Sequence, residues 1–425
     1  MRRVSLNPLI SLLIFIALFA GLQGGRYVFA NRLQEVGTLC ALIVFAIGAW
    51  ITLFRLPGKE WNRWVFNPAL LIFGVMAISG LAFALNFGGN ALYNFFAARE
   101  FLLGFIGPAI VLIVRAGYPL QSLHNVILAC LVALMVNYLY HYNTMDLRAA
   151  FFSSDHTISN LVTYDEWRGF RLKPSMVAVM LAVLVGFMML LQHRSPTSLL
   201  LALTLIGLGA YIWSIVMFRS TLATMVLGLV IYQMFLARRN RVPLAFVVMP
   251  LGFIVAPIVI QIVLQHFAEA DGGSLRLNSF RLALQSIPDH FFFGIGEDSA
   301  YGITYGDLFG KKFSPSDIGL VGIAFKYGVL GLGLYLSMHA IIFVSLWRAN
   351  LAVRSATGQH DPILFALLVL ITAQTLNLPL IAGLGYAQGI TTGSLSLAYA
   401  SLLNRGVEAG GRDVSQIAKN AQLPT

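Results

Sequence analysis

Residues 197–236 read TSLLLALTLIGLGAYIWSIVMFRSTLATMVLGLVIYQMFL and contain a single charged residue, Arg219. A transmembrane helix needs about 20 apolar residues to cross roughly 30 Å of hydrocarbon, so this stretch is too long for one crossing. Backbone groups in lipid must pair within their own segment, which makes the spanning segments helices. The stretch therefore predicts two membrane helices joined by a tight turn, with Arg219 at the tip of the turn.

The composition extends this prediction to the whole chain. The 425 residues are 58% hydrophobic and 11% charged, with a mean hydropathy of +0.80, whereas soluble domains carry about 25% charged residues. We predict an all-α polytopic membrane protein of about 12 transmembrane helices, with residues 1–425 forming a single transmembrane domain. The first apolar run is interpreted as an uncleaved span rather than a signal peptide, since later runs are equally apolar. The predicted spans are 7–25, 35–55, 67–87, 100–117, 119–139, 174–192, 197–217, 220–237, 243–265, 329–346, 362–381 and 385–403.

The distribution of basic residues predicts the orientation. An even number of spans places both termini on one side, together with 15 of the 28 basic residues, all on short loops or tails. The positive-inside rule makes that side cytoplasmic. Two longer loops, at about 140–173 and 266–316, then face outward. The larger loop is expected to contain a short amphipathic helix around Ser279 to Ile287, lying on the bilayer surface.

Several classes of site are disfavoured by the sequence. The eight histidines are scattered without HExxH or paired spacing, and the two cysteines, Cys40 and Cys130, lie inside apolar spans. No GxxxxGK[ST] loop and no GxSxG elbow occurs. We therefore expect no cofactor and no resident metal. The net charge of +11 is interpreted as membrane topology and not as nucleic-acid binding.

The remaining candidate is a phosphate-binding site formed by arginines on the outward face of the membrane. A lone arginine between two spans works against insertion, and an ionisable residue at membrane depth indicates a functional site. Guanidinium groups bind phosphate oxygens bidentately and stay charged at any relevant pH. The natural anionic ligand on that face is a lipid-linked pyrophosphate. Arginines would stabilise the leaving diphosphate in a glycan transfer, and a base would deprotonate the acceptor hydroxyl.

Three stretches together resemble the O-antigen ligase/polymerase family of inner-membrane glycosyl-transfer proteins. The resemblance covers roughly residues 175 to 346, and its specificity comes from the order and outward placement of motifs that are weak singly. The motifs are FRSTLA at 218–223, then RLNSF at 276–280 running through IPDH at 287–290 to GIG at 294–296, and finally SDIGL at 316–320 followed by KYGVLG at 326–331.

This resemblance implies a bacterial inner-membrane location with the two longer loops in the periplasm. It also implies a donor oligosaccharide on an undecaprenyl-pyrophosphate carrier, with Arg219 and Arg276 as catalytic residues that bind the diphosphate. Ligases of the family usually present a catalytic histidine near the start of the tenth span, but here residues 314–317 read SPSD. The missing histidine favours a polymerase over a ligase. Asp317 is the candidate base or acceptor-positioning residue, and the alternative is that it caps the helix that follows.

Four other basic residues are candidate substrate contacts because they lie in the outward loops or at the outer ends of spans: Arg281, Arg171, Arg99 and Lys326. The alternative for the arginines is that they are solvated loop charges. Lys326 has the further alternative of extending its ammonium group to the membrane interface.

The preferred function is that of a glycosyltransferase that polymerises O-antigen or exopolysaccharide from undecaprenyl-pyrophosphate-linked glycan. A ligase acting on lipid A core is the nearest alternative, and a transporter or flippase of lipid-linked sugars is the alternative of another class. A transporter often shows pseudo-symmetric halves with broken helices near the midplane, and the sequence shows no such symmetry. Expected partners are the lipid-linked donor, a glycan acceptor and membrane lipids, with a chain-length regulator as a further candidate and no nucleic acid.

Overall fold

The fold was analysed in a computed structural model, which describes residues 7–27, 32–54, 56–88, 90–165, 169–192, 195–216, 225–226, 229–230, 271–298, 303–310, 313–377 and 387–408. The first half contains α1 (Asn7–Gly21), η1 (Gly24–Tyr27), α2 (Arg32–Thr52), α3 (Gly58–Trp61), η2 (Asn62–Phe66), α4 (Asn67–Phe87), α5 (Ala91–Ala97), η3 (Arg99–Phe105), α6 (Ile106–Arg115), α7 (Leu120–Thr144), α8 (Leu147–Phe151), α9 (His156–Ser159), β1 (Val162–Asp165), β2 (Gly169–Leu172), α10 (Met176–Leu191) and α11 (Pro196–Val216). The second half contains α14 (Asp271–Ser286), η4 (Pro288–His290), α15 (Tyr305–Phe309), η5 (Pro315–Ile318), α16 (Gly319–Thr357), α17 (Pro362–Asn377) and α18 (Ala387–Glu408).

The helices identify an all-α membrane protein. Among the described residues, five helices are long and apolar enough to cross a membrane: Leu33–Thr52, Gly58–Phe87, Leu120–Thr144, Pro196–Val216 and Gly319–Thr357. The pair Ala91–Ala97 and Arg99–Arg115, bent by 51°, raises this number to six if it is one span. Three shorter apolar helices are Asn7–Gly21, Met176–Leu191 and Pro362–Thr375. The described residues therefore do not reproduce the predicted count of twelve.

Part of the difference concerns residues outside the described ranges, and part concerns helix geometry. The predicted spans 220–237 and 243–265 lie outside the described residues, apart from 225–226 and 229–230. The predicted span at 100–117 is not a straight helix, because a 3-10 segment, η3, precedes α6. Elsewhere the prediction was too short: α16 extends over 39 residues with a break at Gly328, where φ is 66°.

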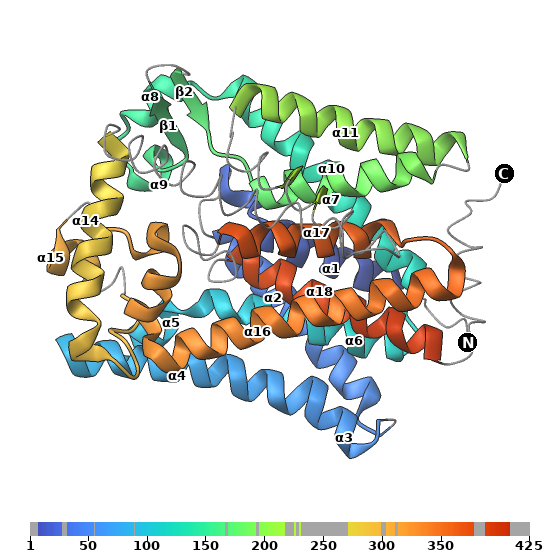
Figure 1. Ribbon diagram of the computed structural model, residues 1–425, viewed down its shortest axis with the longest axis horizontal. Coiled ribbons are helices and arrows are strands. Elements are labelled where there is room, and N and C mark those ends of the chain that lie inside the picture. Colours follow the sequence, from blue (N-terminus) through green and yellow to red (C-terminus); the bar gives the residue numbers. More distant parts are fainter. Residues whose placement is uncertain are drawn as a thin grey trace, which may run out of the picture.

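The outer surface of the bundle has the character expected in lipid. Phe54 is 89% exposed, Leu85 is 83% exposed and Leu70 is 76% exposed. Exposing such side chains to water would forfeit about 1.5–3 kcal/mol each, a loss that hydrocarbon removes. The inside is packed differently: on α17 the segment from Ile363 to Ile371 is fully buried, and this helix packs against α10, α16 and α18 (Figure 1).

The long connections gather at one end of the bundle, which we call the loop end (Figure 1). It is formed by α8, α9 and the hairpin β1–β2, together with α14 and α15. The hairpin was not predicted; its strands pair antiparallel, with Val162 opposite Leu172. The helix α14 covers Ser279 to Ser286 of the stretch predicted as a surface helix; it turns Ala283 inward and leaves Phe280 and Leu284 exposed.

A second apolar core joins the loop end to the membrane helices. Its buried members are Phe83 of α4, Ala283 of α14, Ile295, Tyr305 of α15, Ile318 and Phe325 of α16. Phe325 is within ring-contact distance of Tyr305, at 5.6 Å between centroids. This core fixes residues 291–298 against α4 and the start of α16, and so it positions the polar side chains described next.

Candidate functional site

The site is built on a short backbone pairing between residues 291–296 and the unwound turn of α16. The amide of Ile295 donates to the carbonyl of Phe325 at 2.8 Å, and the amide of Gly296 donates to the carbonyl of Lys326 at 2.8 Å. On the other side of the break, the amide of Val329 donates to the carbonyl of Phe291 at 2.8 Å. The break at Gly328 leaves backbone groups of α16 available, and residues 291–296 use them.

Two glycines make this close approach feasible. Gly296 has a φ of 89°, and a Cβ there would lie 2.3 Å from the carbonyl oxygen of Ser79 on α4. Gly328 has a φ of 66°, and a Cβ there would lie 2.2 Å from the carbonyl oxygen of Phe292. Any other residue at either position would be strained in the backbone and would also collide with a neighbouring chain segment.

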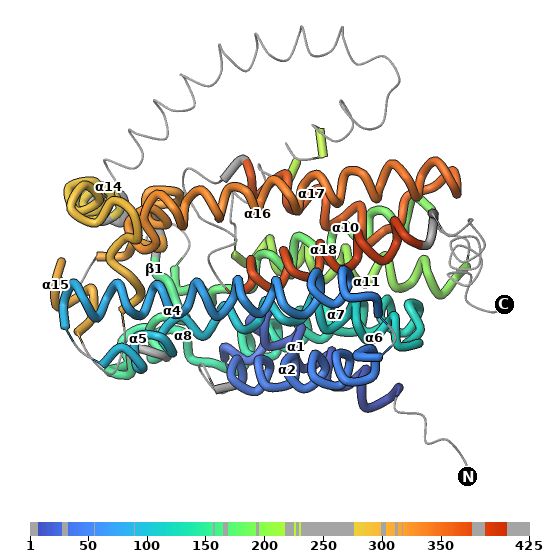
Figure 2. Tube along the Cα trace, turned by 90° about the horizontal axis from the view of Figure 1, so that it is seen from below, coloured from blue at the N-terminus to red at the C-terminus, as the bar shows by residue number. Residues whose placement is uncertain are grey.

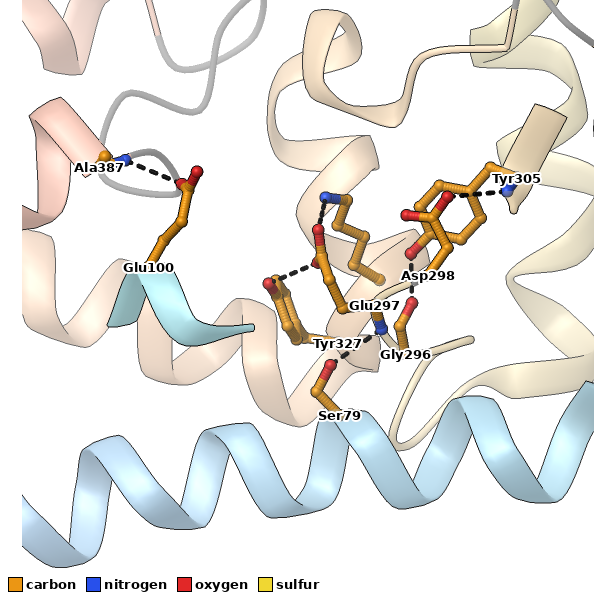
Figure 3. Close-up of polar contacts among 9 residues, drawn as sticks. Ser79, Glu100, Gly296, Glu297, Asp298, Tyr305, Tyr327 and Ala387 are labelled. Atoms are coloured by element: carbon orange, nitrogen blue, oxygen red, sulfur yellow. Dashed lines mark hydrogen bonds and ion pairs between the residues drawn. The ribbon is translucent and has the colours of Figure 1, made fainter. Parts of the chain in front are cut away.

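The polar centre of the site is Glu297, which the pairing places between α4 and the first turns of α16 (Figure 3). Its backbone amide donates to Ser79 Oγ at 2.9 Å. Its carboxylate accepts from Lys326 Nζ at 2.6 Å through Oε1, and from the hydroxyl of Tyr327 at 2.9 Å through Oε2. The side chains of Lys326 and Glu297 are 16% and 19% exposed, so the ion pair is largely withdrawn from water.

Tyr305 and Asp298 support this centre from the loop side. The hydroxyl of Tyr305 donates to the carbonyl of Gly296, and its backbone amide donates to Asp298 Oδ2 at 2.9 Å. Lys326 Nζ lies 5.8 Å from the centroid of the Tyr305 ring, within cation–π range. Burial raises the pKa of the Tyr305 hydroxyl well above its usual value, and burial likewise raises the pKa of the Asp298 carboxyl. Tyr305 is therefore a neutral hydrogen-bond donor at any physiological pH.

The site adjoins a large apolar groove between α4 and α16. Its floor is formed by η3, the start of α6 and α18, and its volume is about 650 Å³. Figure 2 shows α4 and α16 running lengthwise with α18 between them. Tyr327 lines the groove at the loop end, where its ring contacts Phe101 at 5.8 Å. Glu100, next to Phe101, accepts from the backbone amide of Ala387 at the start of α18 (3.1 Å). One tyrosine thus belongs both to the charged centre and to the groove wall.

Of the predicted substrate contacts, Lys326 lies in the site. Its ammonium group pairs with Glu297. Arg99 lies at the start of η3, two residues from Phe101, and pairs with Glu35 at 3.5 Å. Its side chain is 40% exposed.

Arg171 has a different place. It lies on β2, is buried, and donates from Nη1 to the carbonyl of Val216 at 2.7 Å. Val216 is the last residue of α11 and precedes Arg219 by three positions, but Arg219 itself lies outside the described residues. The structure thus places Arg171 beside the chain that leads to the predicted Arg219 turn.

The loop residues of the prediction lie on α14 and η5. Arg276 and Arg281 are exposed on α14. Asp317 is in η5, and its side chain lies outside the described part. The N-cap residue of α16 is Ile318, one position after Asp317, and the capping alternative for Asp317 stays a prediction.

Sequence reasoning did not select Glu297 or Tyr327 as site residues. Both lie in motifs that it did recognise: Glu297 follows GIG at 294–296, and Tyr327 belongs to KYGVLG. A carboxylate directly after a glycine turn in an outward loop is the signal that was available.

Within the described residues no group of three metal-liganding side chains occurs. Glu297, Asp298 and Asp307 bind Lys326, Tyr305 and Thr304 respectively.

Comparisons with known proteins add no relative. No protein-family model matches the chain, and no curated protein matches it.

The chemistry of the site follows from its own groups. A carboxylate held between an ammonium group and a hydroxyl can accept a proton from a third hydroxyl, and the ammonium group can then bind an anion. The adjoining groove can hold a hydrocarbon chain.

Proposed function

We propose that the protein transfers glycan from a lipid-pyrophosphate-linked donor at the loop end of the bundle, most simply as a polysaccharide polymerase facing the periplasm of a bacterial inner membrane. The observation that carries the proposal is the position of Tyr327. Its hydroxyl binds Glu297 and its ring lines the groove, so acid–base chemistry and a lipid-chain site meet at one residue.

In the proposed reaction Glu297 is the general base and Lys326 stabilises the leaving group. The carboxylate of Glu297 accepts the proton of an acceptor hydroxyl, whose oxygen forms a bond to the anomeric carbon of the donor sugar. The bond from that carbon to the diphosphate oxygen breaks, and the lipid diphosphate leaves with the electron pair. Protonation of Glu297 releases Lys326, whose ammonium group then stabilises the leaving diphosphate. Arg219 and Arg276 remain the proposed diphosphate ligands, and Asp317 remains the base favoured by the sequence alone.

Two other functions use the same features. A ligase would carry out the same bond changes with lipid A core as acceptor. A transporter of lipid-linked sugars would use the groove without bond cleavage, and one observation favours it: the groove lining continues from Tyr327 at one end to Arg348 and Arg405 at the other. The helix α16 is also broken, but near the loop end and not near its middle.

The test is complementation of a gene deletion in the host, with surface glycan separated on a gel. Glu297→Gln and Arg219→Ala are compared with wild type and with Asp289→Asn, an exposed carboxylate in the same loop, as the matched control. A polymerase predicts that the two variants leave a single repeat unit, while Asp289→Asn restores the full ladder. Loss of all attached glycan, with long chains kept on the carrier lipid, would indicate a ligase. Full rescue by both variants would remove this site from the reaction.

A further inference from the structure

The groove is longer than one lipid leaflet. Tyr327 and Arg348 are 21 residues apart on α16, which corresponds to about 32 Å at 1.5 Å per residue. The hydrocarbon core of a bilayer is about 30 Å thick. A donor lipid entering from the loop end occupies the leaflet on that side, and the remaining half of the groove faces the other leaflet.

This far half ends in a cluster of arginines, which lies away from the Glu297 centre. Arg63, Arg348 and Arg405 line the groove there, and Arg115 lies beside them, with its guanidinium carbon 5.5 Å from the ring centroid of Trp64. Within the described residues their one ion-pair partner is Glu60, which binds Arg115 at 2.8 Å and also binds Arg405. The cluster therefore carries an excess of positive charge.

The groove wall at this end also offers neutral donors. Trp64 lines the groove, is 7% exposed, and has an indole N–H without a hydrogen-bond partner in the described structure. A buried donor left unpaired costs about 1–3 kcal/mol, which a ligand acceptor would recover. The polar groove residues Asn67, Ser345, Ser401 and Asn404 lie at this same end. Between them and Tyr327 the lining is mostly apolar, with residues such as Leu334 and Met338.

We propose that the far half of the groove binds an anionic phospholipid, with its phosphate on Arg63 and Arg348 and its acyl chains along Met338. Charge complementarity selects the headgroup, because basic pockets between membrane helices bind anionic headgroups at the cytoplasmic surface. The apolar wall selects the chains, because an open groove at membrane depth is filled by hydrocarbon and not by water. The site is separate from the Glu297 centre and does not depend on the proposed glycan transfer.

The test compares lipids bound to the full-length protein purified in detergent. Binding of phosphatidylglycerol, phosphatidylcholine with the same chains, and glycerol phosphate is measured by native mass spectrometry. We expect phosphatidylglycerol to bind about thirtyfold more tightly than phosphatidylcholine, since each basic residue near an anionic headgroup contributes about a fivefold factor. Equal affinity of the two lipids would overturn the headgroup assignment. Binding of glycerol phosphate as tightly as phosphatidylglycerol would overturn the role of the groove.

Variants locate the site. The double variant Arg63→Gln/Arg348→Gln is expected to lose the preference for phosphatidylglycerol, because it removes two groove cations that no described carboxylate pairs with. Arg354→Gln, on the same helix but outside the groove lining, is the matched control and should keep the preference. Met338→Trp should weaken both phospholipids by filling the chain site. Retention of the full preference by the double variant would contradict the proposal.

Discussion

The ion pair between Glu297 and Lys326 gives the sharpest prediction. Its atoms are 2.6 Å apart and its side chains are 16% and 19% exposed. Coulomb's law at an effective dielectric constant of about 20 gives roughly 6 kcal/mol of gross attraction. Desolvation of the two charges offsets most of this, which leaves about 2 kcal/mol for the coupling between the two residues.

A double-mutant cycle measures this coupling. Lys326→Met leaves a largely buried carboxylate without its cation and should lower the free energy of unfolding by about 3 kcal/mol. Glu297→Gln should cost less, because the amide oxygen still accepts from Tyr327. The double variant should be more stable than the sum of the single losses predicts, by about 2 kcal/mol. Unfolding of purified protein by denaturant in detergent provides the free energies. A coupling below about 0.5 kcal/mol would refute the argument that the pair organises the site.

Three further predictions concern single positions. Gly296→Ala should lower the free energy of unfolding by about 3 kcal/mol, because its Cβ would lie 2.3 Å from the Ser79 carbonyl oxygen. Gly310 also has a positive φ, of 97°, but no neighbour within 4 Å, so Gly310→Ala should lower the free energy of unfolding by only about 1 kcal/mol. Equal losses in the two variants would show that the close approach of Gly296 to α4 is unimportant. Burial, with a smaller contribution from the charge of Arg354, lowers the pKa of His360 to about 4. Because the pKa is lowered in the folded protein, this group contributes stability that is fully present above about pH 6.5 and is lost as the pH falls toward 4. The free energy of unfolding should fall by about 1 kcal/mol over that window, after allowance for solvent exposure, and the melting temperature should fall with it. A drop of the same size in His360→Gln would contradict this assignment. Tyr327→Phe should reduce glycan transfer about tenfold with little loss of stability, because it removes the hydroxyl bonded to Glu297 and keeps the groove wall; unchanged transfer would exclude the hydroxyl from the reaction.

The helical architecture was predictable because it depends on local composition. An apolar stretch of about 20 residues forms a helix in lipid whatever its neighbours are, and so the predicted spans in the described parts correspond to helices. The bend between α5 and η3 and the break at Gly328 were not predictable in the same way. The break is stabilised by residues 291–296, which supply partners for the backbone of α16 from a distant segment.

The candidate site was only partly predictable, and the reason is again sequence separation. Lys326 was selected as a charged residue at the outer end of a span, and it lies in the site. Glu297 depends on Ser79, 218 residues away, for its backbone position, and no periodicity links the two. Arg171 was expected to line the substrate cavity, but it is buried against the carbonyl of Val216, a contact that only the tertiary fold defines.

The measurement that tests the central claim most directly uses the purified protein in liposomes with an oligosaccharide on polyprenyl diphosphate. We predict that wild type releases polyprenyl diphosphate and forms a longer glycan. Glu297→Gln should reduce this release at least a hundredfold, as expected for loss of a general base, and Asp289→Asn should leave it unchanged. Movement of intact donor across the bilayer, with no diphosphate release by any of the three proteins, would contradict glycan transfer and support a transporter.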